Sequence, residues 1–471
     1  MHNFEKYKAR LAACGNFAKY NPDLDTESPT VSMTVFFLCL ETAAREKLHK
    51  TAADIGGAFL YGISDQQHLM RFSKSVTEVL IAKIPSLSKY MCNDKCIVVE
   101  LKKTLYGVRE ASRSFFEVLK TELIKFKLIQ SKIDKCLFYS KDTNGNRLIV
   151  LVYVDDLLIM STRKQDTEAL LVALKSHFKE VTTKNGPHIS FLGMEIATDT
   201  QDNVRVNQSS YLSTIVEESG TTSSAATAST DSLMKDHSNL PACDKKSFYS
   251  TTMKLMYAAV RTRPDILYTV SVLASRVSTP TTGDRASLDH LLRYIYGTLD
   301  DGLVYRHDST WCVSLSVDAS FNHHHDAKGH SGFVIFASDG SAGILSKSLK
   351  QKTVANSSCE AELIALHEAV LHLIYILNIY QELGYLASVP IKIGQDNKAA
   401  ILLSQSDPVN FKGRSKFINR LYFSVHEHVQ NGVVELVHVG TNDTIADFLT
   451  KSLIGDKFRK FKVVLMGSSD N

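Results

Sequence analysis

Two apolar segments on either side of an acidic pair constrain the fold of this chain more than any other feature. Residues 148–154 are continuously apolar, Asp155 and Asp156 follow, and residues 157–160 are apolar again. Short apolar runs separated by a turn predict two buried strands joined as a hairpin. Adjacent carboxylates held at a rigid tip repel each other unless a cation neutralises them, which indicates bound metal. Taken alone, the pair is better explained as an ordinary acidic β-turn.

The composition permits several folded domains. The chain has 471 residues, 44% hydrophobic and 22% charged, so it is neither disordered nor fibrous and has room for roughly two to four domains. The apolar run at 148–154 is far shorter than the ~20 residues that span a bilayer. The eight cysteines are scattered and form no disulfide framework. We therefore expect an intracellular protein without a membrane partner.

The second half of the chain changes character twice. Small polar residues over 219–230, continuing without apolar periodicity to about residue 246, predict a linker or long surface loop. Apolar residues at helical spacing follow over 248–300. Strands are then predicted at 311–317, 332–336, 343–345, 389–393 and 433–439, with a helix at 361–383. The last third therefore predicts a mixed α/β domain.

Further motifs stand in a fixed order around the acidic pair. Residues 7–11 read Tyr-Lys-Ala-Arg-Leu, residues 54–59 read Asp-Ile-Gly-Gly-Ala-Phe, residues 104–107 read Thr-Leu-Tyr-Gly, and residues 191–193 read Phe-Leu-Gly. The two glycines after Asp54 permit close approach of the backbone. Over residues 6–308 this order resembles the reverse transcriptase of copia-type retrotransposons.

The resemblance implies a role for each matching residue. Asp54, Asp155 and Asp156 would be palm carboxylates that hold two Mg²⁺ ions for an in-line phosphoryl displacement. Phe59 would lie under the sugar of the nucleotide and exclude a 2′-hydroxyl, with plain core packing as the alternative. The resemblance also implies nucleotide contacts by Lys8 or Arg10, Tyr106 and Gly107, and primer positioning by Phe191, Leu192 and Gly193.

Four acidic residues of the last third stand where predicted strands end or helices begin. They are Asp318, Glu362, Asp396 and Asp447. Helix capping explains any one of them but not the set, whereas four converging carboxylates fit a two-metal hydrolytic site. Residues 311–455 resemble the ribonuclease H domain that follows reverse transcriptase in the same elements, which implies that these four are metal ligands. Glu360 is the competing choice for Glu362. Residues 323–325, three histidines, are expected in a solvated turn, with metal binding as the alternative.

The expected architecture is a multidomain protein of the α/β and α+β classes. Polymerase fingers and palm with an antiparallel sheet are expected over 1–218, and the linker over 219–246. A helical thumb or connection is expected over 247–308, a ribonuclease H-like mixed α/β domain over 311–455, and a C-terminal tail over 456–471.

The function implied by the resemblance is an RNA-directed DNA polymerase with an attached ribonuclease H, using two Mg²⁺ ions per site or Mn²⁺ in their place. The implied partners are an RNA template, a DNA primer, an RNA–DNA hybrid, deoxynucleoside triphosphates and other parts of a Pol polyprotein. Only seven residues precede Lys8, so we expect a piece of a longer polyprotein with incomplete fingers. A catalytically inactive nucleic-acid-binding relic and a protein with ribonuclease H activity alone are the alternatives. The implied location is a cytoplasmic virus-like particle, with the nucleus as a second place.

Overall fold

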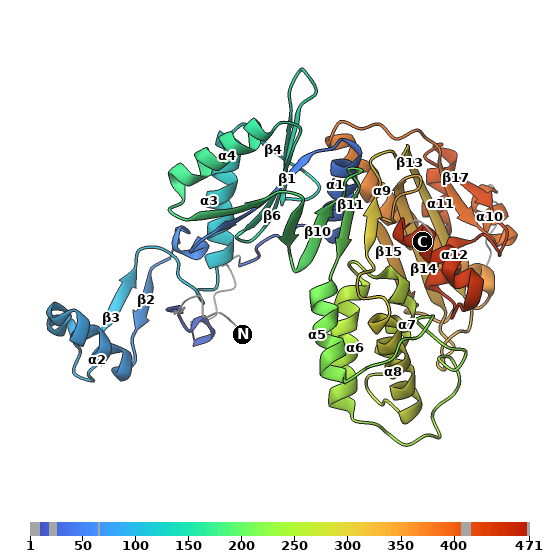
Figure 1. Ribbon diagram of the computed structural model, residues 1–471, viewed down its shortest axis with the longest axis horizontal. Coiled ribbons are helices and arrows are strands. Elements are labelled where there is room, and N and C mark those ends of the chain that lie inside the picture. The colour runs from blue at the N-terminus through green and yellow to red at the C-terminus, as the bar shows by residue number, and fades with distance from the viewer. Residues whose placement is uncertain (1–9, 18–25, 65, 407–415, 469–471) are drawn as a thin grey trace. The chain divides into compact units, whose positions relative to one another are not determined.

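The computed structural model describes residues 10–17, 26–64, 66–406 and 416–468, apart from the side chains of 416–422. The chain divides into two compact units (Figure 1). The first unit consists of residues 1–31 and 51–184, and the second of residues 32–50 and 185–471. The first unit thus ends at residue 184, whereas the polymerase segment was predicted to continue to residue 218.

A six-stranded sheet, in the order β4-β5-β6-β7-β1-β8, forms the core of the first unit. Its strands are β1 (His49–Ile55), β4 (Ile129–Gln130), β5 (Leu137–Lys141), β6 (Arg147–Tyr153), β7 (Asp156–Ser161) and β8 (Val181–Asn185). Strands β5, β6 and β7 pair antiparallel in chain order, which confirms the predicted hairpin around the acidic pair. All residues of β6 except Tyr153 are buried, as its continuous apolar sequence requires.

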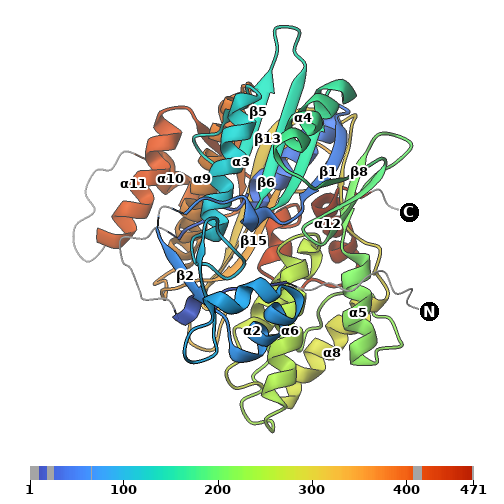
Figure 2. The ribbon, with the colours of Figure 1, turned by 90° about the vertical axis from the view of Figure 1, so that its left-hand side faces the viewer.

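Two helices, α3 (Ala111–Lys125) and α4 (Lys164–His177), cover one face of this sheet (Figures 1 and 2). In α3 the buried residues Phe115, Leu119 and Leu123 recur every four positions, so they share one helix face. A separate hairpin of β2 (His68–Arg71) and β3 (Val98–Leu101) carries α2 (Lys74–Lys83) and belongs to the same unit.

The second unit begins with α1 (Met33–Arg45), whose sequence is almost entirely buried. It contains a four-stranded sheet in the order β12-β11-β10-β9 and a group of four helices, α5 to α8 (Figure 1). The strands are β9 (His188–Phe191), β10 (Met194–Thr198), β11 (Val204–Asn207) and β12 (Leu303–Tyr305). The helices are α5 (Ser209–Ser219), α6 (Lys245–Ala259), α7 (Leu267–Ala274) and α8 (Thr282–Tyr296), which confirms the helical spacing over 248–300.

A five-stranded sheet in the order β15-β14-β13-β16-β17 completes the second unit. Strands β13 to β15 pair antiparallel, whereas β13, β16 and β17 are parallel neighbours, so the predicted mixed α/β domain is confirmed. The elements are β13 (Trp311–Ser320), β14 (His330–Ser338), β15 (Leu345–Lys350), α9 (Ser358–Glu382), β16 (Ile391–Gln395), α10 (Lys398–Gln405), α11 (Lys416–Gln430), β17 (Val434–His438) and α12 (Gly455–Met466).

Helix α9 begins three residues earlier than the sequence predicted. The hydroxyl of Ser357 caps it by accepting a hydrogen bond from the backbone N–H of Glu360. By length and composition α9 is apolar enough to cross a membrane. Its buried residues, however, pack against β13 and β14, which explains the apolar sequence as that of a core helix.

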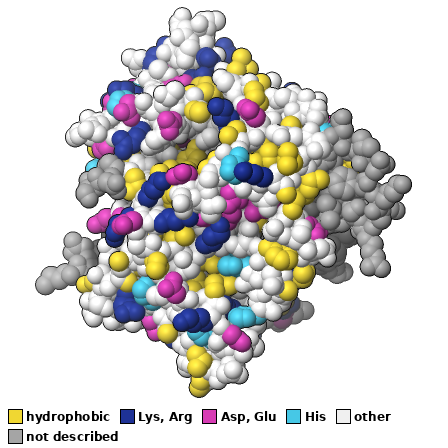
Figure 3. All heavy atoms as spheres, turned by 90° about the vertical axis from the view of Figure 1, so that its right-hand side faces the viewer, with side chains coloured by type: hydrophobic (Ala, Val, Ile, Leu, Met, Phe, Trp, Pro, Cys, Tyr) yellow, Lys and Arg dark blue, Asp and Glu magenta, His cyan; other side chains and the backbone are white. Residues whose placement is uncertain are grey.

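The polar segment between α5 and α6 is attached to the rest of the second unit. Its Ala228 and Leu233 side chains are buried, and the Ser229 hydroxyl lies 2.7 Å from that of Ser452. The helices α5 to α8 and the five-stranded sheet share one hydrophobic core. On the face shown in Figure 3, lysine and arginine side chains lie among acidic ones, in keeping with a formal net charge of only +4.

Candidate active sites

The first candidate site lies at the tip of the β6–β7 hairpin. Tyr153 pairs with Asp156, so Val154 and Asp155 form the turn. Val154 has a φ of 56°, a left-handed conformation that a β-branched residue rarely adopts. The backbone N–H of Ile55 donates to the Asp155 carbonyl at 3.0 Å, which brings the end of β1, with Asp54, beside the tip.

The three carboxylates of this site act on one another electrostatically. Burial, together with the negative charges of Asp155 and Asp54, raises the pKa of Asp156 to about 6. The raised pKa shows that burial and the neighbouring negative charges together disfavour the ionised form of Asp156. Oxygen ligands of this kind are those that Mg²⁺ and Mn²⁺ prefer, so the donor set fits the predicted ions.

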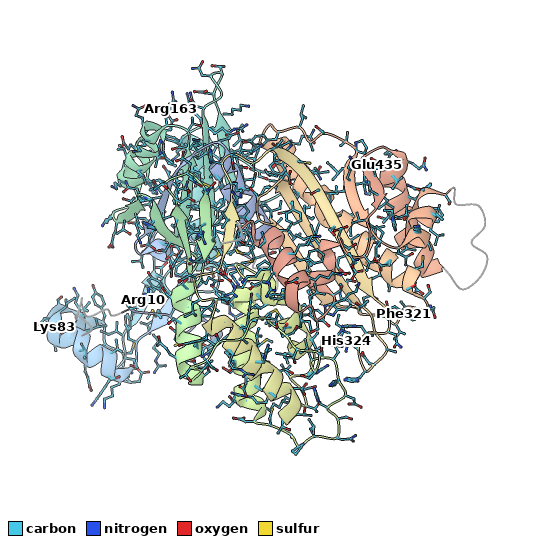
Figure 4. The ribbon with its side chains drawn as sticks, turned by 45° about the vertical axis from the view of Figure 1, so that its right-hand side comes forward. Arg10, Lys83, Arg163, Phe321, His324 and Glu435 are labelled. Atoms are coloured by element: carbon cyan, nitrogen blue, oxygen red, sulfur yellow. The ribbon has the colours of Figure 1, made fainter. Side chains whose placement is uncertain are left out.

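Three residues predicted to contact the nucleotide lie together in the first unit. Phe59, in the 3₁₀-helix η2 (Ala58–Leu60), has its ring centroid 5.2 Å from that of Tyr106 in an edge-to-face contact. The guanidinium of Arg10, labelled in Figure 4, lies 5.4 Å from the Tyr106 ring centroid. Phe59 and Tyr106 are half-buried, so both rings have an exposed part. Lys8 lies outside the described residues.

The position of Gly107, directly after Tyr106, requires a glycine. Its φ is 86°, and a Cβ atom there would lie 1.9 Å from the carbonyl oxygen of Ala13. The neighbouring backbone is held by a 2.6 Å hydrogen bond from the Ala13 N–H to the Tyr106 carbonyl. Glycine is therefore needed for both conformation and space.

The Phe-Leu-Gly motif forms the turn between β9 and β10 in the second unit. Phe191 is buried and stacks on Phe36 at 5.7 Å between ring centroids. Leu192 and Gly193 adopt positive φ values of 52° and 71°. The Tyr257 hydroxyl donates to the Leu192 carbonyl at 3.1 Å, which fixes the turn on α6. Phe191 is thus a core residue. Of the three residues of this motif, only Leu192 and Gly193 are accessible to solvent.

The second candidate site lies at one edge of the five-stranded sheet. Asp318 is near the end of β13, and Asp396 follows the last residue of β16, which is a parallel neighbour of β13. Glu362 comes from the first turns of α9, which packs on β13. One carboxylate oxygen from each of these three residues lies within 4.8 Å of the other two. This arrangement of three oxygen donors fits a divalent cation.

Burial makes this second site strongly electronegative. Burial and the charges of Asp318 and Asp396 raise the pKa of Glu362 to about 9. Burial also raises the pKa of Asp318, to about 6. Gln395 Nε2 donates to Glu362 Oε2 at 3.2 Å, and the Thr450 hydroxyl donates to Asp318. These two polar neighbours orient the carboxylates.

Asp447, the fourth predicted ligand, has other partners. It lies in the 3₁₀-helix η5 (Ile445–Leu449) with its side chain buried. One carboxylate oxygen pairs with Lys451 and the other with Lys457, the latter at 2.7 Å. The ammonium of Lys451 also lies 3.5 Å from each carboxylate oxygen of Asp318. The structure therefore brings Asp447 beside the other three but not into their cluster.

Sequence reasoning missed four polar residues at this site: Gln395, Thr450, Lys451 and Lys457. One signal was available, because Lys451 stands four residues after Asp447, a spacing at which opposite charges pair on a helical turn. The others are recognisable only when β13, β16 and the C-terminal segment are placed together.

The prediction of a solvated histidine turn after β13 was wrong for His324, which is buried (labelled in Figure 4). His324 Nε2 lies 3.0 Å from His330 Nδ1, and His330 Nε2 lies 2.7 Å from the Ser348 hydroxyl. Because Ser348 donates its own proton to the Leu449 carbonyl, it accepts from His330. Burial lowers the pKa of His324 to about 4. These residues form a neutral hydrogen-bonded chain within the fold.

Comparison with known proteins identifies the family of this chain. Residues 2–231 match the family model described as reverse transcriptase (RNA-dependent DNA polymerase). The chain is 30% identical over 470 residues to the retrovirus-related Pol polyprotein from transposon RE2 of Arabidopsis thaliana, covering 98% of this chain and 30% of the relative. It is 28% identical over 483 residues to that from transposon TNT 1-94 of Nicotiana tabacum, covering 99% of this chain and 34% of the relative.

The chain also matches solved structures at low identity. A foamy viral protease-reverse transcriptase in complex with RNA/DNA hybrid aligns with a TM-score of 0.47 and 12% identity, over 92% of this chain and 48% of that chain. The present chain spans about a third of the length of the curated relatives that it matches.

Proposed function

We propose that this chain is an RNA-directed DNA polymerase joined to a ribonuclease that cuts the RNA of RNA–DNA hybrids. Its first half is a reverse transcriptase domain of the copia-type retrotransposon Pol family. The observation that carries the polymerase part is the convergence of Asp54, Asp155 and Asp156 at one hairpin tip. The observation that supports the nuclease part is the carboxylate cluster of Asp318, Glu362 and Asp396.

In the polymerase, Asp54, Asp155 and Asp156 would hold divalent cations. Such ions, when bound, supply charge neutralisation for an in-line phosphoryl displacement between a primer hydroxyl and a deoxynucleoside triphosphate. The strained turn at Val154 fixes the direction of the two adjacent carboxylates. Phe59 presents a rigid ring beside Tyr106, which is suited to excluding a ribose 2′-hydroxyl.

Arg10 supplies a positive charge beside the Tyr106 ring. Its guanidinium, placed over the Tyr106 ring, is suited to binding a triphosphate. We propose that the Leu192–Gly193 turn positions the primer end through its exposed backbone. The RNA template, the DNA primer and the nucleotides are the partners of this activity, and a cytoplasmic particle is its proposed location.

In the nuclease, Asp318, Glu362 and Asp396 would hold the divalent metal, which when bound supplies a nucleophilic hydroxide and a Lewis acid. Gln395 and Thr450 orient two of these carboxylates through the hydrogen bonds described above. The raised pKa of Glu362 means that this carboxyl releases a proton when a cation binds.

Primer extension on an RNA template with the purified chain tests the polymerase. We expect deoxynucleotide incorporation that falls by at least about a thousandfold in Asp155→Asn. Asp166→Asn, a matched change in the first turn of α4, where the carboxylate pairs with Arg163, should leave it intact. Retained binding of a template–primer with no incorporation would instead identify a non-catalytic relic.

Cleavage of an end-labelled RNA–DNA hybrid tests the nuclease. We expect cleavage that persists in Asp155→Asn and is lost in Asp396→Asn. Asp456→Asn is the control, because the side chain of Asp456 is 95% exposed and pairs with Arg459 outside the cluster. Cleavage without any incorporation would leave a protein with ribonuclease H activity alone, and loss of both activities in the unmodified chain would overturn the proposal.

A further inference from the structure

The Leu192–Gly193 turn rests on one side chain of α6, that of Tyr257. The Tyr257 hydroxyl donates to the Leu192 carbonyl at 3.1 Å, and a Cβ atom at Gly193 would lie 3.2 Å from the same hydroxyl. The turn joins the directly paired residues Phe191 and Met194, and both of its residues have positive φ, as tight two-residue hairpin turns require. The position of the turn therefore depends on that of the Tyr257 ring.

Two further residues fix the Tyr257 ring. Tyr211 of α5 packs against it at 5.1 Å between ring centroids, and the Tyr211 hydroxyl donates to the Lys254 carbonyl at 3.1 Å. The guanidinium carbon of Arg261 lies 3.7 Å from the Tyr257 ring centroid, a close cation–π contact. The same tyrosine thus holds the turn through its hydroxyl and an arginine through its ring.

Arg261 is a cation without an acidic partner in the part of the chain that the structure describes. It forms no ion pair with a carboxylate there, and its Nε is buried without a hydrogen-bond acceptor. The neighbouring cations differ, because Lys254 pairs with Glu218 and Arg263 pairs with Asp265. The positive charge of Arg261 is therefore available to an anion from outside the chain.

Helix capping explains only part of this arrangement. Arg261 lies two residues after the end of α6, and its Nη1 donates to the Tyr257 carbonyl in the last turn of that helix at 3.2 Å. That bond uses one of the five guanidinium N–H groups. The side chain is half-buried, so it is ordered by the ring and the carbonyl but still reaches the surface. A planar guanidinium held in this way is suited to a phosphate group.

We propose that Arg261 binds a backbone phosphate of the primer strand, close to the primer end that the Leu192–Gly193 turn positions. Tyr257 is then a positioning residue, which holds the turn and the guanidinium in one arrangement. Because a phosphate contact carries no sequence information, Arg261 would act on primers of any sequence. The inference rests on the proposed role of the turn in the polymerase and assigns the strand and the chemical group that α6 contacts.

The salt dependence of template–primer binding tests the contact. Binding of a fluorescent RNA template–DNA primer to the full chain is followed by anisotropy at several salt concentrations, with a chelator present. Arg261→Gln should weaken binding by about tenfold and lower the slope of log Kd against log salt by about one. Arg261→Lys should keep the slope. Arg285→Gln, which removes an arginine paired with Asp289, is the matched control and should change neither quantity.

Two changes at Tyr257 separate its ring from its hydroxyl. Tyr257→Phe keeps the ring under the guanidinium, so the slope should match that of the parent chain. Tyr257→Ala removes the ring and should reproduce the slope of Arg261→Gln. Equal urea midpoints for parent and variants show that each protein is folded. A slope unchanged in Arg261→Gln would overturn the inference.

Neutral linkages in the nucleic acid identify the strand. A methylphosphonate replaces one phosphate at a time near the primer 3′ end or at the opposed positions of the template. One primer position should cost the parent chain about tenfold in affinity and cost Arg261→Gln nothing further, as in a double-mutant cycle. Coupling to a template position, or to no position, would refute the assignment to the primer.

Primer extension measured in parallel separates this inference from the proposed function. Incorporation by the parent chain without coupling between Arg261 and a primer phosphate would overturn the inference and leave the polymerase proposal standing. Coupling in a chain that binds template–primer but extends nothing would support the inference and contradict polymerase activity.

Discussion

Replacing Glu362 by glutamine should stabilise the metal-free protein at neutral pH. Burial and two neighbouring acids raise the pKa of Glu362 from 4.5 to about 9. The folded state therefore keeps a proton that the unfolded state releases, and stability falls as the pH rises through this window. Glutamine has nearly the same shape, carries no charge and avoids this loss.

The size of the effect follows from the two pKa values. At pH 7.5 the unfolded carboxyl is three pH units above its pKa of 4.5, and the folded one is still protonated. At 1.36 kcal/mol per pH unit, the free energy of unfolding is lowered by about 4 kcal/mol. In the presence of a chelator, Glu362→Gln should regain this stability. At pH 5 the gain should fall below about 1 kcal/mol. Saturating Mg²⁺ should narrow the difference in the free energy of unfolding between Glu362→Gln and the parent chain at pH 7.5. The reason is that only the parent chain retains all three carboxylate ligands and is stabilised by the ion.

Urea unfolding followed by tryptophan fluorescence reports this difference. The sequence has a single tryptophan, Trp311, which lies in β13 of the same unit and whose ring centroid is 5.7 Å from that of Tyr385. The matched control is Glu360→Gln, two residues away on α9, where the carboxylate instead bonds to Asn356. A Glu362→Gln protein no more stable than the parent chain at pH 7.5, or a gain equal at pH 5 and pH 7.5, would refute the reasoning.

Three further substitutions have defined outcomes. Phe59→Ala should raise ribonucleotide incorporation relative to deoxynucleotide incorporation by about tenfold in primer extension, and an unchanged ratio would show that the ring only packs. Asp265→Asn should lower the free energy of unfolding by about 3–5 kcal/mol in urea titrations, because it leaves Arg263, fully buried and paired at 2.8 Å, without its counter-charge. Gly107→Ala should raise the KM for the nucleotide by about tenfold through the contact with the Ala13 carbonyl, whereas Gly145→Ala, at a similar φ of 84° but in open space, should leave KM unchanged.

Local patterns predicted the elements that carry the acidic residues. The run 148–154, the acidic pair and the run 157–160 became β6, a turn and β7, because residues adjacent in sequence need only a hairpin to meet. Helix α9 and four strands of the last third were likewise predicted from local patterns, whereas the strand expected at 343–345 was misplaced, because β15 runs from Leu345 to Lys350. The burial of His324 was not, because a turn rich in histidine has the composition of a solvated loop until neighbouring strands cover it.

The order of motifs by itself determined the family and singled out seven candidate carboxylates. Only the tertiary structure decided which of them share a site and what else is there. Asp318, Glu362 and Asp396 meet because parallel pairing of β13 and β16 and the packing of α9 bring three distant segments to one sheet edge. Asp447 is drawn to Lys451 and Lys457 instead, because a buried carboxylate takes the nearest cation, and its neighbours in space are not specified by any local pattern.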